Sequence, residues 1–291
     1  MKKIRFILLS VVAAMMVGCG TTSTVPVTGR KQNLLVSDEQ VLSLSNQQYS
    51  EYMSSAKPST NSTNTAMVKR VGQRIATAVE TYLKNNGLAD EVKNYAWEFN
   101  LVQDTQVNAW CMPGGKIVVY EGILPVTKDE ASLAIVLGHE VAHAVAKHSA
   151  ERLSNAYKEQ YGSQILGAVL QGAGVSEGTQ QLIALGQQFG GKLLTSGFSR
   201  KQESEADHMG LIFAAMAGYD PQVATTFWQR MAQLGNSSNS LFSDHPSDET
   251  RIKQIQGWMS EALTYYKPQT TTTKKTTTTK KTTTKKTTTK K

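Results

Sequence analysis

The sequence predicts an α+β fold that is mainly helical and has one small β-sheet beside a central helix. Apolar residues recur with helical spacing over 37–52 and 65–85. The pattern changes over 95–124, where aromatic and β-branched residues alternate with others and a Pro-Gly-Gly turn divides two such runs. Helical spacing returns after residue 127. We therefore expect a short sheet between two sets of helices.

The central helix is expected to begin at a capping box. Thr127 and Glu130 have the required spacing, in which a hydroxyl closes the helix start and a carboxylate three residues on bonds back. The apolar pattern then continues without a break to about residue 154. Shorter helices joined by Gly-rich loops are expected over 160–197, and further helices at 199–217, 221–234 and 247–263.

The N-terminal segment differs in composition from the middle of the chain. Residues 1–18 have a basic start and a short apolar stretch, and Cys19 follows a glycine, which resembles a bacterial lipoprotein signal peptide. The resemblance implies cleavage before Cys19, a lipid anchor on its sulfur, and a place on the outer membrane facing the periplasm, because Gly20 is not Asp. An uncleaved anchor helix or an ordinary secretory signal is the alternative.

These features divide the chain into four parts. Residues 19–33 are expected to form a flexible Thr-rich tether, 34–266 a single folded domain, and 267–291 a disordered Lys/Thr-rich tail. The chain has two cysteines. With Cys19 lipidated, only Cys111 remains, so no internal disulfide is expected.

The net charge of +8 comes from the two ends of the chain. Nine Lys lie in 267–291 and three basic residues in 1–18, which leaves 19 basic against 23 acidic residues over 19–266. A mildly acidic domain gives no reason to expect nucleic-acid binding. The tail could bind anionic lipid or a cell-wall polymer. A solvated tail without a partner is the simpler alternative.

The stretch LGHEVAHAVAKH at 137–148 contains three of the five histidines. His139 and His143 are four residues apart and share one face of the predicted helix, so both imidazoles can bind one zinc ion. Glu140 lies beside them, where it can take a proton from the attacking water. This HExxH pattern is typical of metallopeptidases, and a His-rich surface stripe is the alternative.

A hydrolytic zinc site needs a third protein ligand. SRKQESEADHMG at 199–210 offers acidic residues on a later helix. Glu203 could complete the set, with Asp207 one turn on as a hydrogen-bond partner for a ligand imidazole. Spacing alone does not choose between Glu203 and Glu205, and it leaves a solvated acidic stripe as a further alternative.

HEVAH followed by SRKQESEAD resembles the HtpX-like and CAAX-prenyl-protease-like (Ste-type) zinc metallopeptidases. NAWCMPGGKIVVYEGIL at 108–124 and DHPSDETRI at 244–252 resemble further segments of that family, so the resemblance covers roughly 65–265. Periplasmic lipoprotein members, LoiP-like and BepA-like, are the most similar, although this chain lacks the helical repeats of BepA-like proteins. A zincin-like α+β domain is implied, with the sheet beside the HExxH helix.

The resemblance also implies one zinc ion held by His139, His143 and Glu203, with Glu140 as the base. It implies an endopeptidase that degrades unfolded or misfolded envelope proteins. The matching histidine of BepA-like relatives can occupy the zinc, so His245 is a candidate switch. An oxyanion donor and a plain loop residue are its alternatives. Arg251 could orient substrate, brace that loop or form a surface salt bridge.

Other residues near these motifs have simpler interpretations. His148 lies five residues after His143 and is expected to face away from the site as a structural residue, and His208 likewise. Cys111 is expected to be a small buried side chain. The strand 116–120 is expected at the sheet edge, where it could pair with an extended substrate.

Two functions of other classes remain open. The chain could be a chaperone or assembly factor for outer-membrane proteins that cuts rarely. It could also be a structural lipoprotein whose tail binds lipid or the cell wall.

Overall fold

The computed structural model describes residues 21–170, 195, 197–233 and 249–268, with side chains left out over 160–170. The described chain is mainly helical with two small sheets, so the predicted α+β class is confirmed. The predicted signal peptide, Cys19, His245 and the tail beyond Pro268 lie outside the described residues. None of the described helices is long and apolar enough to cross a membrane.

Two long helices precede the larger sheet, as the periodicity predicts. They are α2 (Asp38–Ser55) and α3 (Ser62–Asn85). Ser37 and Gln40 form a capping box at the start of α2. Gly87, with φ of 74°, lies just after α3, where the left-handed backbone favours glycine. The apolar face of α3 packs in the main core, and a short 3-10 helix, η1 (Ala89–Asn94), leads to the sheet.

The three-stranded sheet has the order β3-β5-β4 (Glu98–Val102, Lys116–Tyr120, Ala109–Met112). The central strand β5 runs parallel to β3 and antiparallel to β4. The prediction that 116–120 is the edge strand is therefore wrong. The tight turn at 113–115 pairs β5 with β4, and β3 pairs with the other side of β5. All five residues of β5 are buried. In the described structure the edge toward the central helix belongs to β4.

The central helix, α5 (Glu130–Val145), starts differently from the prediction. Asp129 is its N-cap and accepts a hydrogen bond from the backbone N–H of Ser132 at 2.7 Å. Thr127 instead ends a preceding short helix, α4 (Leu124–Thr127), and its hydroxyl donates to the Leu124 carbonyl. The predicted capping box is wrong because Lys128, with φ of 66°, separates the two helices.

The central helix also ends earlier than predicted. α5 stops at Val145, and a new helix, α6 (His148–Leu170), begins after a break at Lys147, whose φ is 57°. Most of the segment predicted as short helices over 160–197 lies outside the described residues. The later helices agree with the prediction in type and approximate position: they are α9 (Arg200–Met216), α10 (Val223–Gln233) and α12 (Glu249–Tyr265).

Residues 21–34 form a β-hairpin where a flexible tether was predicted. Its strands, β1 and β2, are Thr21–Thr24 and Lys31–Leu34. Val25 is 1% exposed and belongs to the main core, while Leu34 packs beside α2 and α6. Composition suggested a tether because the segment is Thr-rich. The apolar side chains that anchor it are single residues with no periodicity.

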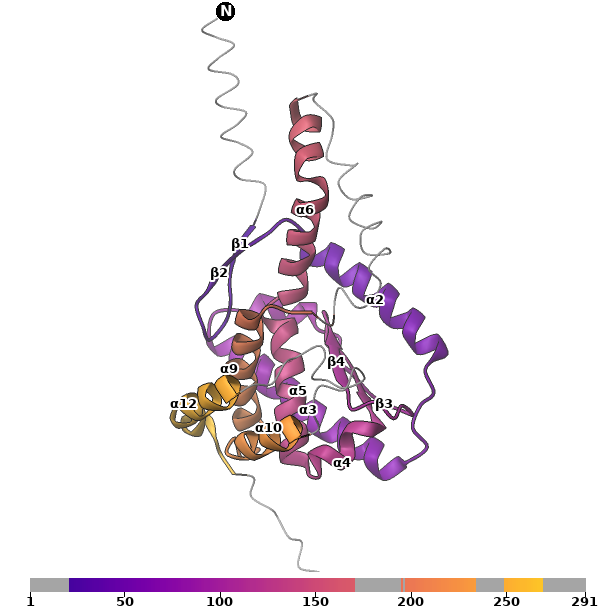
Figure 1. The fold of residues 1–291 in the computed structure, drawn as a ribbon, viewed down its shortest axis with the longest axis vertical. Helices are drawn as coiled ribbons and strands as arrows, with labels where there is room; N and C mark the ends of the chain where they lie inside the picture. Colours follow the sequence, from indigo (N-terminus) through magenta and orange to yellow (C-terminus); the bar gives the residue numbers. More distant parts are fainter. Residues whose placement is uncertain (1–20, 171–194, 196, 234–248, 269–291) are drawn as a thin grey trace, which may run out of the picture.

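The middle of the molecule is the pair α5 and α9, with α3, α10 and the sheet around it (Figure 1). Gly138 on α5 lies against Gly210 on α9. A Cβ on Gly210 would come 2.6 Å from the backbone nitrogen of His139, and one on Gly138 would come 2.6 Å from the Gly210 carbonyl oxygen. The two backbones therefore touch at this crossing, one residue before the HExxH motif.

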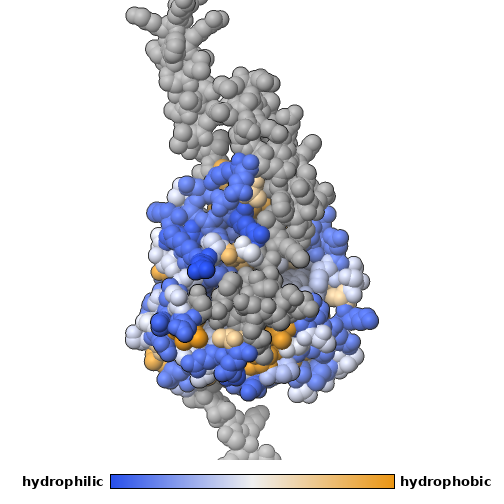
Figure 2. Space-filling view, in the orientation of Figure 1, coloured by the Kyte–Doolittle hydropathy of each residue, from blue (hydrophilic) through white to orange (hydrophobic). Residues whose placement is uncertain are grey.

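The surface contrasts with this packed interior. The face shown in Figure 2 is mainly hydrophilic, with hydrophobic residues gathered in its lower half. The largest fully buried side chains lie around the central helix pair; among them are Trp228, Phe213, Phe227, Leu133 and Leu137.

The helix crossing predicts the effect of a single methyl group. Gly210→Ala should lower the free energy of unfolding by about 1–3 kcal/mol, because backbone atoms must move to admit the Cβ. Gly257→Ala is the control, since a Cβ at this exposed position of α12 would have nothing within 4 Å. It should be neutral or stabilising by up to about 1 kcal/mol. Urea denaturation measures both, and equal stability of the two variants would contradict the close crossing.

Candidate active site

Three buried side chains meet where α5 and α9 cross. The Nε2 atoms of His139 and His143 lie 3.1 Å apart. Carboxylate oxygens of Glu203 lie 3.5 Å from each of these nitrogens. The imidazoles come from successive turns of α5, and Glu203 comes from the first turn of α9, which begins with a capping box at Ser199. The three residues form a group that could hold a metal ion.

The donor set fits zinc. Zinc binds imidazole nitrogen and carboxylate oxygen at about 2.0–2.1 Å in tetrahedral sites, so adjacent ligand atoms lie about 3.3–3.4 Å apart. The separations of 3.1 and 3.5 Å agree with this spacing. Hydrolytic zinc sites have three protein ligands of these types, and water or substrate takes the fourth coordination position. Spacing in the sequence did not choose between Glu203 and Glu205, and the fold places Glu203 in the set.

His139 is held from behind by an acidic partner. Its Nδ1 lies 2.8 Å from Asp207 Oδ1, and Arg251 Nη2 donates to the same oxygen at 2.6 Å. The Arg251 side chain also covers the ring of Trp228, with its guanidinium carbon 3.5 Å from the ring centroid. Arg251 is 4% exposed, so the surface salt-bridge interpretation is wrong. Asp207 lies where the sequence placed it, beside a ligand imidazole.

These charges act on the protonation of His139 in the metal-free protein. Burial and the nearby Arg251 lower its pKa, but the charge and hydrogen bond of Asp207, together with Glu203, outweigh them and raise it to about 9. Zinc binds the neutral imidazole, so metal and proton compete for this residue.

His143 has different neighbours. Its ring stacks on Phe198 with the centroids 4.0 Å apart, and its Nδ1 lies 2.9 Å from His148 Nδ1. The prediction that His148 faces away from the site is therefore wrong. An unbroken helix would have put it on another face, and the break at Lys147 turns it back.

Glu140 is 2% exposed and lies on α5 between the two histidines. Cys111 lies on β4, the strand that packs against α5. Burial first, and then Glu140, raise the pKa of Cys111 well above its usual value. The thiol is thus a neutral buried side chain, as expected.

Glu205 and His208 contact residues outside the three-residue set. Glu205 faces the N-terminal hairpin, where Arg30 Nε donates to it at 2.7 Å. His208 bonds Glu261 at 2.7 Å and stacks on Trp258. His245 lies outside the described residues, so its switch role stays a prediction. Sequence reasoning missed Phe198 and Trp228, because single aromatic residues at unrelated positions carry no pattern.

Comparison with known proteins identifies this arrangement. Residues 63–259, more than half of the chain, match peptidase family M48. The chain belongs to this family. M48 peptidases are zinc-dependent metallopeptidases, which agrees with the His139, His143 and Glu203 set. The chain is thus a metallopeptidase by family, and zinc is its metal.

Several named proteins are similar to this M48 chain. It is 38% identical to the mitochondrial metalloendopeptidase OMA1 of Schizosaccharomyces pombe over 217 residues, which are 73% of this chain and 58% of that protein. It is 29% identical to the metalloprotease LoiP of Escherichia coli over 192 residues, 64% of this chain and 74% of LoiP.

A third relative is the beta-barrel assembly-enhancing protease of Escherichia coli, 26% identical over 174 residues, 56% of this chain and 34% of that protein. The chain spans about half the length of the OMA1 proteins it matches. The metallopeptidase resemblance is confirmed at the level of M48. The OMA1 of Schizosaccharomyces pombe has higher identity than either bacterial protein, so the comparisons do not single out the lipoprotein members.

The contact between Asp207 and His139 predicts a change in metal affinity. At a pH above the His139 pKa of about 9, where no proton competes for the imidazole, Asp207→Asn should weaken zinc binding by roughly 10–100-fold, because the ligand imidazole loses its anionic partner. Competition with a chromophoric chelator measures the dissociation constant. Asp90→Asn is the control, since Asp90 is exposed and pairs only loosely with Lys93 at 3.8 Å. Unchanged affinity in Asp207→Asn would exclude a supporting role for this carboxylate.

The raised pKa of His139 predicts pH-dependent metal binding. Zinc affinity should rise from pH 6 towards the pKa of about 9 and then level off, because the competing proton is lost over that range. Calorimetry in buffers of different ionisation enthalpy should show proton release at pH 7. Asp207→Asn lowers this pKa and should release fewer protons. Binding without proton release at pH 7 would contradict the assignment.

Proposed function

We propose that the chain is a zinc-dependent endopeptidase that degrades unfolded or misfolded proteins of the bacterial cell envelope. The observation that carries the proposal is the His139, His143 and Glu203 set with Glu140 on the same helix as the two histidines. Membership of family M48 supports peptide bonds as the substrate.

The residues divide the chemistry between them. Zinc, when bound, supplies a Lewis acid that polarises the peptide carbonyl and lowers the pKa of water toward about 7. Glu140 takes a proton from the water that attacks the carbonyl carbon, and passes a proton to the amide nitrogen as the C–N bond breaks. Asp207 holds the imidazole of His139 in orientation.

The edge strand β4 supports a preference for extended substrates. In the described structure β4 pairs only with β5, and it packs against α5, the helix that carries Glu140. An extended peptide that adds to the outer edge of β4 would lie along the active-site helix. Backbone pairing depends little on side chains, which suits an enzyme for unfolded chains of varied sequence.

We further propose a lipid anchor at Cys19 and a place on the outer membrane facing the periplasm, as in LoiP-like and BepA-like lipoproteins. The signal-like segment 1–18 supports this, and so do the two Escherichia coli relatives. The tail over 267–291 would then contact anionic lipid or cell-wall polymer. A chaperone or assembly role with little proteolysis is the second candidate, favoured by the name of the assembly-enhancing relative.

The role of Glu140 predicts a variant that keeps its metal and loses activity. Glu140→Gln should cut an unfolded model protein such as reduced casein about 10²–10⁴-fold more slowly than the wild type at equal zinc content. Glu51→Gln, an exposed position on α2, should cut at the wild-type rate.

The outcomes separate the candidate functions. Cleavage lost in Glu140→Gln with zinc retained supports the endopeptidase. Zinc bound by both proteins with cleavage by neither would favour the assembly factor. Equal cleavage by both would contradict Glu140 as the base.

A further inference from the structure

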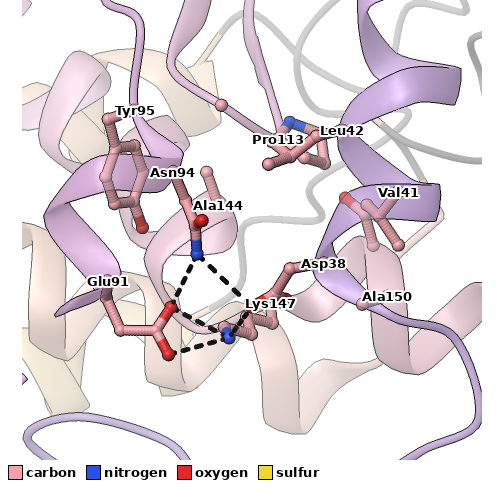
Figure 3. Close-up of a pocket in the computed structure, with 12 residues that line it drawn as sticks. Asp38, Val41, Leu42, Glu91, Asn94, Tyr95, Pro113, Ala144, Lys147 and Ala150 are labelled. Carbon is pink, nitrogen blue, oxygen red and sulfur yellow. Dashed lines mark hydrogen bonds and ion pairs between the residues drawn. The ribbon is translucent and has the colours of Figure 1, made fainter.

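The break between α5 and α6 is held by partly buried ion pairs. Lys147 takes the left-handed backbone conformation that most residues avoid. Its Nζ lies 2.8 Å from Asp38 Oδ2 and 2.9 Å from Glu91 Oε2, at a pocket between α2, η1 and the start of α6 (Figure 3). Gln32 of the N-terminal hairpin donates to the Ala146 carbonyl at 2.9 Å from the other side. The chain therefore fixes the break from two directions.

The consequence of the break is the position of His148. Its side chain is fully buried, with Nδ1 at 2.9 Å from His143 Nδ1 and Nε2 at 3.3 Å from Glu205 Oε2. A ligand imidazole that offers Nε2 to a metal carries its proton on Nδ1 and needs an acceptor there. His148 can be that acceptor only if its own proton is on Nε2, and Glu205 is placed to accept that proton's hydrogen bond.

The acceptor Glu205 is itself fixed by the hairpin. Arg30 Nε donates to both carboxylate oxygens of Glu205, at 2.8 and 2.7 Å, and Thr28 Oγ1 donates at 3.0 Å. The Nη1 and Nη2 atoms of Arg30 donate to the Glu151 carboxylate at 2.6 and 2.8 Å.

We infer that His148 is a positioning residue for the metal ligand His143, and that the N-terminal hairpin is part of the metal site through Arg30 and Glu205. The hydrogen bonds run in one direction, from His143 to His148 to Glu205, which is anchored by Arg30. The carboxylate of Asp207 contacts His139 directly. The carboxylate of Glu205 reaches His143 only through the imidazole of His148. The inference rests on the metal site of the proposed function and is tested without proteolysis.

The test separates hydrogen bonding from space filling. His148→Phe keeps a ring of similar shape without an acceptor, and His148→Asn offers a polar atom near the position of Nδ1. Zinc affinity, measured by chelator competition, should be roughly 10–100-fold lower in His148→Phe than in the wild type. In His148→Asn it should be close to the wild-type value. The d–d absorption of bound Co²⁺ should change in His148→Phe alone. His208→Phe is the control, because the His208 ring contacts Glu261 and Trp258 of α12 and neither metal-ligand imidazole. Wild-type affinity and spectrum in His148→Phe would overturn the inference.

The hairpin is tested by a matched pair of arginines. Arg30→Gln should weaken zinc binding several-fold, whereas Arg70→Gln should not, since Arg70 forms a more exposed ion pair with Glu130. Equal zinc affinity in the two variants would reduce the hairpin to a structural strap and overturn its part in the site.

A measurement on the wild-type protein tests the inference even if the variants fail to fold. Long-range ¹H–¹⁵N NMR of the zinc-loaded protein should show His148 neutral with its proton on Nε2. A proton on Nδ1, or on both nitrogens, would overturn the inference. Glu140→Gln serves as the independent reference. If Glu140→Gln cut as fast as the wild type, the proposed peptidase mechanism would fail. The zinc affinities and the His148 tautomer would still test the present inference on their own.

Discussion

The contact of α5 with α9 is the constraint on which the site depends. The two helices cross with Gly138 against Gly210, so that their backbones touch. At that distance the first turn of α9 brings Glu203 to the two imidazoles, and the next turn brings Asp207 behind His139. A side chain at either glycine would part the helices and widen the ligand set. The two glycines, which have no reactive side chain, therefore fix the geometry of the metal-binding residues.

The charges around this crossing explain why a metal suits it. Glu140, Glu203 and Asp207 are all buried, and Arg251 pairs with Asp207. The crossing buries three carboxyl groups beside one guanidinium, so its acidic groups exceed what Arg251 alone can balance. Buried charge without compensation is costly, and a divalent cation at the ligand set would supply that balance. The same acids hold a proton on His139 in the metal-free protein, so proton and metal are alternative ways to offset them.

Local pattern predicted the helices, the small sheet and the HExxH face, because each depends on residues close in sequence. Glu203 and Asp207 followed as candidates from helical spacing, but choosing Glu203 over Glu205 required the resemblance, and the fold agrees with it. The errors at the two ends of α5 and at His148 share a physical origin in single residues whose backbone departs from the pattern. The left-handed backbone at Lys128 moves the N-cap of α5 to Asp129, and that at Lys147, just after the helix, turns His148 inward. Strand order and the hairpin packing of 21–34 depend on distant contacts that no periodicity carries.

The position of the bound zinc ion is the most direct test of this metal site. A crystal of the zinc-loaded protein, with data collected on both sides of the zinc absorption edge, locates the ion by its anomalous signal. We predict one strong peak about 2.0–2.1 Å from His139 Nε2, His143 Nε2 and a Glu203 oxygen, with one further coordination position. A peak coordinated by Glu205 or Cys111 instead, or none at the crossing of α5 and α9, would contradict the assignment.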